Sequence, residues 1–99
     1  MPMTIDPPAE TPLEVHGRTS GELMRELRKQ RHLVLRDVTE ATRRIAEAQN
    51  NEEYAISPGR LSEVENKGVV PGIFRLYALS VVYQVELREL LSYFGIPRE

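Results

Sequence analysis

The sequence has no cysteine and only two histidines among its 99 residues. Without thiols, the chain can form neither a disulfide framework nor a thiolate metal site. His16 and His32 lie far apart in sequence and have no carboxylate at metal-ligand spacing, so we expect no metal site. No serine lies in a glycine-flanked turn between a strand and a helix, and no glycine-rich loop follows a strand. The sequence therefore predicts neither an enzyme nor a bound cofactor.

Long apolar runs are missing as well. No stretch approaches the roughly 20 apolar residues of a membrane-spanning helix, and the first residues lack the basic-then-apolar pattern of a secretory signal. We therefore expect no membrane contact and a cytoplasmic location. The chain is 40% hydrophobic and 28% charged, a balance typical of globular proteins, and its length suits a single domain.

The net charge of −2 conceals an uneven distribution. Residues 18–44 carry eight basic and four acidic side chains, whereas the rest of the chain carries five basic and eleven acidic ones. A charged stretch of this kind is usually a solvated helix surface, but it can also form the positive face of a nucleic-acid-binding protein. Charge alone leaves both interpretations open.

Residues 1–17 predict a flexible or extended arm, because they hold four of the seven prolines and show little apolar periodicity. The arm carries three acidic residues and no arginine, since the first arginine of the chain is Arg18, so we do not assign the arm to DNA, whose minor groove attracts basic arms. Residues 13–16 alternate briefly between apolar and polar, which is compatible with a short strand or with packing on a partner. The helical domain is expected over residues 18–96.

Two helices are expected in the basic stretch. Thr19 and Glu22 fit a capping box, which starts a first helix near residue 20 that ends near His32, a turn residue. Its inward stripe is Leu23, Met24 and Leu27. The second helix is long, from about Val34 to Gln49. Its apolar residues recur at three- and four-residue steps, namely Leu35, Val38, Ala41 or Thr42, Ile45 and Ala48.

A third helix is expected over residues 57–66. Residues 50–53 break the preceding pattern, and Tyr54 and Ile56 offer apolar anchors for the returning chain. Ser57 can cap the new helix, and Pro58 suits its first position, where a backbone N–H would have no partner. The apolar stripe of this helix consists only of Leu61 and Val64. We therefore expect this helix to pack on the core through that narrow stripe and to present its polar residues to a binding partner.

The C-terminal third predicts two more helices, over residues 73–83 and 86–93. The fourth helix is expected to turn a stripe inward, and four aromatic residues are expected in the core or at its edge. The stripe is Ile73, Leu76, Tyr77, Leu79 or Ser80, and Tyr83, and the aromatic residues are Phe74, Tyr77, Tyr83 and Phe94. The predicted fold class is all-α, with five helices and an elongated second helix.

Two blocks of the sequence resemble the xenobiotic-response-element (XRE) family, the phage-repressor or Cro type of helix-turn-helix regulators of bacterial transcription. The first block is Gly21-Glu-Leu-Met-Arg-Glu-Leu-Arg-Lys-Gln-Arg-His-Leu-Val-Leu-Arg-Asp-Val-Thr-Glu40, and the second runs from Ile56-Ser through Arg60-Leu-Ser-Glu-Val-Glu-Asn-Lys-Gly to Leu90-Leu91. The resemblance implies a five-helix domain that regulates transcription by binding double-stranded DNA. The helix of residues 57–66 would enter the major groove. A single helix reads few bases, so we expect a homodimer on a two-fold site.

The resemblance also assigns roles by position. Base reading falls on Pro58, Gly59, Ser62 and Glu63, and phosphate contacts fall near Arg36, Arg60, Asn66 and Lys67. Ser57, the helix cap, completes the expected set of DNA-binding residues. The chain departs from the family pattern in having about twelve additional residues, 43–54, between the second and third helices.

The reading positions depart from the pattern too, since proline and glycine offer no side-chain donor and Glu63 is acidic. Glu63 can instead pair with Arg60 or Lys67. The alternative function is therefore a protein-interaction module that keeps the scaffold but has lost base reading. Its docking element would be the additional segment with Glu47, Glu52 and Glu53.

Overall fold

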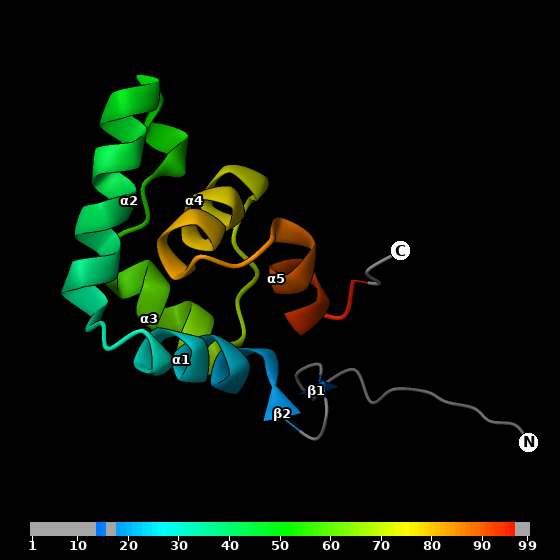
Figure 1. Cartoon of the computed structure of the whole chain (residues 1–99). Coiled ribbons are helices and arrows are strands. Elements are labelled where there is room, and N and C mark those ends of the chain that lie inside the picture. The colour runs from blue at the N-terminus through cyan, green and yellow to red at the C-terminus, as the bar shows by residue number, and fades with distance from the viewer. Residues whose placement is uncertain (1–13, 16–17, 97–99) are drawn as a thin grey trace, which may run out of the picture.

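The computed structural model describes residues 14–15 and 18–96, and it confirms an all-α domain with five helices in that part of the chain. Helix α2 stands along one side, α1 crosses beneath it, and α4 and α5 fill the opposite side (Figure 1). The elements are β1 (Glu14–Val15), β2 (Arg18–Thr19), α1 (Ser20–Gln30), α2 (Leu35–Gln49), the 3-10 turn η1 (Glu52–Tyr54), α3 (Pro58–Lys67), α4 (Ile73–Tyr83) and α5 (Leu87–Tyr93).

The helix starts follow from local capping. The Thr19 hydroxyl accepts a hydrogen bond from the Glu22 N–H, and the Glu22 carboxylate accepts one from the Thr19 N–H, both at 3.1 Å. This is the predicted capping box, which satisfies two N–H groups that the helix itself leaves unpaired. The Ser57 hydroxyl accepts from the Arg60 N–H at 3.1 Å, so α3 begins at Pro58 as expected and ends one residue later, at Lys67, than predicted.

The N-terminal residues form a small hairpin. Strands β1 and β2 pair antiparallel, with Glu14 opposite Thr19, and β1 lies next to α5. The strand interpretation of residues 13–16 is therefore confirmed for Glu14–Val15. The rest of the predicted arm, residues 1–13 and 16–17, lies outside the described residues.

One apolar core joins the five helices. The predicted stripes supply most of it. Of the two alternatives on α2, Thr42 is fully buried and Ala41 is half-buried, and the one correction there is Ala48, which is exposed. Ala48 lies in the last turn of α2, beyond the point where the other helices cover it. The buried apolar side chains are Met24, Leu27, Val38, Ala46, Ile56, Leu61, Val64, Leu76, Ala78, Leu79, Tyr83, Leu90 and Phe94.

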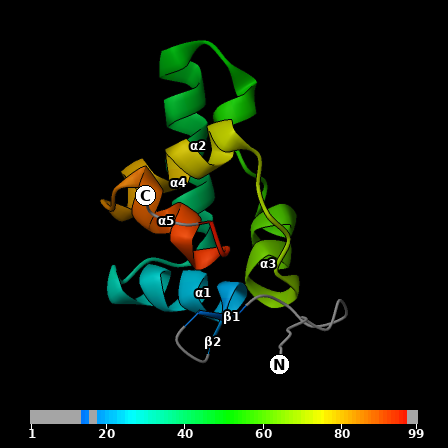
Figure 2. The same ribbon diagram turned by 90° about the vertical axis from the view of Figure 1, so that its right-hand side faces the viewer.

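Residues 43–54, expected to be additional, form the second half of α2 and the turn η1. The buried Thr42 hydroxyl donates to the Thr39 carbonyl at 2.9 Å and accepts from the Ile56 N–H at 3.2 Å. The Arg75 guanidinium donates to the Ala55 carbonyl at 2.8 Å. These bonds fix the returning chain against α2 and α4. The extra length lies at the end of α2 far from α3 (Figures 1 and 2), so α3 returns to the first half of α2.

The expectation that Phe74 and Tyr77 belong to the core or its edge is wrong. They are 39% and 45% exposed, and Ile73, predicted to face inward, is 56% exposed. Helix α4 is apolar on almost every side, so its periodicity does not reveal which side meets the core. The prediction is confirmed for Tyr83 and Phe94, which are buried.

Tyr83 is fully buried, and its hydroxyl has no hydrogen-bond partner among the described residues. Burial is the main cause that raises the pKa of its phenol above the ordinary value of 10.0, and the nearby Glu65 raises it further. An unpaired buried hydroxyl costs about 1–3 kcal/mol. The side chain therefore contributes its ring, not its hydroxyl, to the core.

Tyr83→Phe should leave the free energy of unfolding at pH 7 unchanged or raise it by about 1 kcal/mol, because the orphaned hydroxyl is removed. A raised folded-state pKa means that the folded protein holds the proton more tightly than the unfolded chain. The stability that the neutral Tyr83 phenol contributes is therefore fully present below its ordinary pKa of 10.0 and is lost as pH rises above that value. Urea unfolding at several pH values should show that the variant loses less stability in alkali. Tyr93, whose pKa burial also raises, accounts for a residual loss. A large destabilisation at pH 7 would contradict an unpaired hydroxyl.

Candidate nucleic-acid interface

Helix α3 is buried on one side and exposed on the other. Leu61 and Val64 are fully buried, as their spacing predicted. The outward residues are those predicted to contact DNA: Ser57, Pro58, Gly59, Arg60, Asn66 and Lys67 are exposed, and Ser62 and Glu63 are partly exposed. The predicted site therefore forms one continuous helix surface.

Arg36 joins this surface from α2. With Ser57 and Pro58 it lines a groove of about 460 Å³ between α2 and the N-terminal end of α3. Lys67 lies at the opposite end of α3, where it lines a hollow with Asn66 and Gly68. Neither cation forms an ion pair within the described part of the chain. A cation that forms no ion pair thus lies near each end of the exposed helix, although Glu40 and Glu52 also line the groove beside Arg36.

Arg60 is paired with Glu63. Its guanidinium donates to the Glu63 carboxylate at 2.8 Å, and both side chains are nearly half exposed. An exposed pair of this kind stabilises a protein little, because water competes for both charges. A phosphate can therefore replace the carboxylate at small cost.

Asn66 and Ser62 are engaged with each other. The Asn66 amide donates to the Ser62 hydroxyl at 3.0 Å, and its carbonyl oxygen accepts from Arg25. A phosphate contact by Asn66, as the resemblance implies, would have to replace one of these bonds. Arg36, Arg60 and Lys67 are therefore better placed than Asn66 to meet a phosphate.

The packing of α3 against α1 depends on an ion pair that was not predicted from the sequence. The Arg28 guanidinium donates to both carboxylate oxygens of Glu65, at 2.7 and 2.9 Å. Their side chains are only 12% and 3% exposed. Arg28 also donates to the Leu33 carbonyl at 3.0 Å. The hydrogen bond to Glu65 is the main cause that raises the pKa of Arg28. This bidentate hydrogen bond fixes the orientation of α3 relative to α1.

Gly21 allows α1 to approach α3. A β-carbon at this position would lie 2.1 Å from the Glu65 carbonyl oxygen and 3.0 Å from the Val64 carbonyl oxygen. Real β-carbons do not come that close to backbone atoms, so only glycine fits here without moving a helix.

The spacing of these residues does carry a signal. Gly21, Met24 and Arg28 follow one another at three- and four-residue steps, and Glu65 is four residues after Leu61. Residues at these steps share a helix face. Extending each apolar stripe to include the polar residues within it would have placed Arg28 and Glu65 at the contact between the helices.

The described residues, 14–15 and 18–96, contain no group of acidic residues and histidines that could hold a metal ion. No helix in the same ranges is long and apolar enough to cross a bilayer. Comparisons with protein-family models, with curated proteins and with solved structures found no match.

Proposed function

We propose that the chain is a sequence-specific DNA-binding regulator of transcription that inserts α3 into the major groove of double-stranded DNA. The proposal rests on how α3 is held. Its buried side is fixed to α1 by the Arg28–Glu65 pair, and its exposed side lies between Arg36 and Lys67. The major groove is about 12 Å wide and admits one α-helix. A rigid, outward helix with cations at both ends suits this groove.

Each exposed residue has a role that follows from its chemistry. Arg36 and Lys67 would bind phosphates on either side of the groove, and Arg60 would join them by exchanging Glu63 for a phosphate. Glu63 would then be available to accept a hydrogen bond from a cytosine amino group. Pro58 and Gly59 add little bulk, so the N-terminal end of α3 can approach the base pairs closely. Two copies on a two-fold site would give the specificity that one helix lacks.

A second function is favoured by one observation. In the structure, Glu63 neutralises Arg60, the only arginine on α3. If this pair stays closed, Arg60 cannot bind a phosphate, and the domain would act as a protein-interaction module. Light scattering with and without duplex separates the two functions, because the module would ignore DNA.

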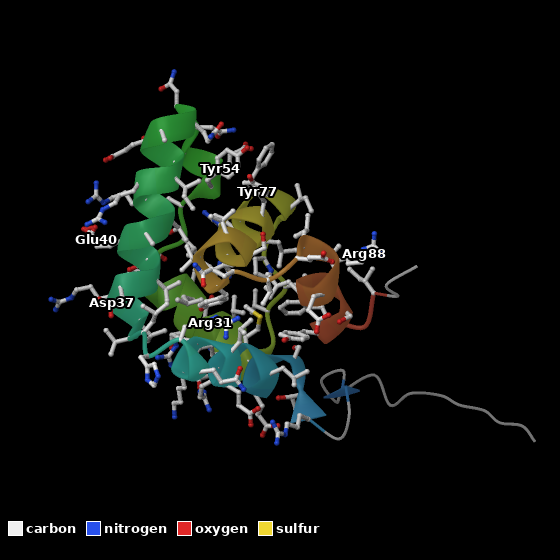
Figure 3. The ribbon with its side chains drawn as sticks, viewed as in Figure 1. Arg31, Asp37, Glu40, Tyr54, Tyr77 and Arg88 are labelled. Atoms are coloured by element: carbon white, nitrogen blue, oxygen red, sulfur yellow. The ribbon has the colours of Figure 1, made fainter. Side chains whose placement is uncertain are left out.

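Lys67→Ala and Arg60→Ala should each weaken binding to a random duplex. Each lost phosphate contact should reduce the slope of log affinity against log salt by about 0.9. Arg88→Ala is the matched control: Arg88 is exposed on the side of α5 turned away from α2 (Figure 3), so its loss should leave the slope unchanged. Fluorescence anisotropy of a labelled duplex at several salt concentrations measures the slopes. No salt-dependent binding to any duplex, even at low ionic strength, would refute the proposal.

A further inference from the structure

The outer side of α4 and the neighbouring η1 carry a continuous apolar surface. Ile73, Phe74, Tyr77 and Val81 of α4 are 39–56% exposed. The half-buried Tyr54 of η1 meets the rings of Phe74 and Tyr77 edge to face, with centroid distances of 5.1 and 5.9 Å. Tyr54 and Tyr77 lie side by side at the end of the molecule away from α1 (Figure 3). We call these five residues the α4 face.

The α4 face lacks the charges that normally keep a helix surface in water. Arg75 is the only charged residue in α4, and its guanidinium donates to the Ala55 carbonyl at 2.8 Å. The opposite side of α4 buries Leu76 and Leu79 in the core. A helix that is apolar on all sides is typical of one that is covered on all sides. The composition of α4 therefore indicates that its outer side is covered too.

The extent of the α4 face matches the centre of a protein interface. Aromatic side chains present about 150–250 Å² each, and Ile and Val present less, so the five partly exposed side chains leave roughly 400 Å² in contact with water. That is within the range of about 300–600 Å² for the largest apolar patch of a monomer, a patch that is often functional. It is also about half of the roughly 800 Å² that each partner buries in a standard interface.

We propose that the α4 face binds the same face of a second copy of this chain, with the two α4 helices antiparallel about a two-fold axis. Ile73, Tyr77 and Val81 recur every four residues and therefore form one ridge along the helix. An axis at Tyr77 brings Ile73 of each copy opposite Val81 of the other. Beside Ile73 lies a hollow of about 250 Å³, lined by Glu53, Gly72, Ile73, Phe74 and Arg75, and its apolar side can receive that valine.

Charge favours a second copy as the occupant. Two identical surfaces can meet only if neither concentrates charge of one sign at the contact, and the α4 face has no charged side chain. Two exposed acids, Glu52 and Glu53, lie beside its N-terminal end in η1. In the antiparallel arrangement the two copies hold these acids at opposite ends of the interface, so they do not repel one another. The inference deepens the proposed function, since it supplies the pairing that a two-fold DNA site requires, but it rests on the α4 face alone.

Light scattering on the full chain tests the interface without DNA. At about 100 µM, above the micromolar dissociation constants of the weaker protein interfaces, the protein should have twice its mass of 11.3 kDa. Val81→Glu and Tyr77→Glu should each reduce the mass to that of one chain while the helical circular dichroism stays unchanged. Ala48→Glu, an apolar-to-acidic change at an exposed position of α2, should leave the dimer intact.

Cross-linking provides a second measurement that does not depend on a disruptive charge. The chain has no cysteine, so Tyr77→Cys introduces a single thiol per copy, next to the expected axis. A short bismaleimide, which adds one thiol at each end, should link two copies of this variant but not two copies of Ala48→Cys.

A wild-type protein that stays monomeric at this concentration would overturn the inference. So would a dimer that survives both glutamate substitutions, or a Tyr77→Cys protein that links no better than the control. Failure of the proposed DNA binding gives a different result. A dimer with these properties that does not bind DNA supports the interface and refutes only the DNA proposal. Conversely, a monomer that binds duplex DNA refutes only the interface.

Discussion

Gly21→Ala is expected to lower the free energy of unfolding by about 3 kcal/mol, the upper end of the usual cost of overpacking. Local preference predicts the opposite sign, because alanine in a helix is more favourable than glycine by about 1 kcal/mol. Tertiary contact decides, since the new β-carbon would lie 2.1 Å from the Glu65 carbonyl oxygen. That atom belongs to the backbone of α3 and cannot rotate away as a side chain would. Relief requires α1 and α3 to separate.

Gly59→Ala is a closely matched control. Gly59 is the second residue of α3, as Gly21 is of α1, but a β-carbon there meets no atom within 4 Å. The control should therefore be as stable as the wild type or more stable. A change of 1 kcal/mol shifts the Tm of a domain this size by about 4–8 °C, so thermal unfolding should separate the two variants by more than about 12 °C. Equal melting temperatures would show that α1 and α3 do not approach as closely as the structure has them.

The helices were predictable because their ends are set by residues close in sequence. Thr19 with Glu22, and Ser57 with Pro58, start α1 and α3 at the expected positions. The exposed side of α3 was predictable for the same reason, since Leu61 and Val64 alone mark its buried side. Capping and the buried side of a helix depend on residues three or four positions apart, so one sequence is enough to predict them.

Contacts between distant segments were not predictable in this way. Arg28 and Glu65 are 37 residues apart, and the approach of Arg36 to Pro58 depends on how residues 43–57 return along α2. On α4, Leu76, Leu79 and Tyr83 are buried as predicted, but Ile73 and Tyr77 were wrongly placed inward. Both sides of this helix are apolar, and only the position of the other helices distinguishes them. In each case the missing information is tertiary.

Glu65→Ala should cost about 3–5 kcal/mol, because it leaves the Arg28 guanidinium inside the protein without its acidic partner. Arg25 cannot replace the carboxylate, since it is itself a cation 3.6 Å from Glu65. Glu63→Ala, two residues away on the same helix, removes only an exposed pair with Arg60 and should change stability little. Urea unfolding of both variants measures the difference. Similar losses would show that the Arg28–Glu65 pair is open in solution.

The double variant Arg28→Met with Glu65→Leu separates stability from orientation. Replacing both partners of a buried pair by apolar side chains is often neutral, so the double variant should recover most of the stability that Glu65→Ala loses. The Leu33 carbonyl still loses its donor, which leaves a small deficit. If the proposed function holds, DNA affinity distinguishes two roles for the pair. Recovered stability with weak DNA binding would mean that the bidentate hydrogen bond holds α3 at the angle needed to enter the groove, whereas recovery of both would mean that packing alone sets that angle.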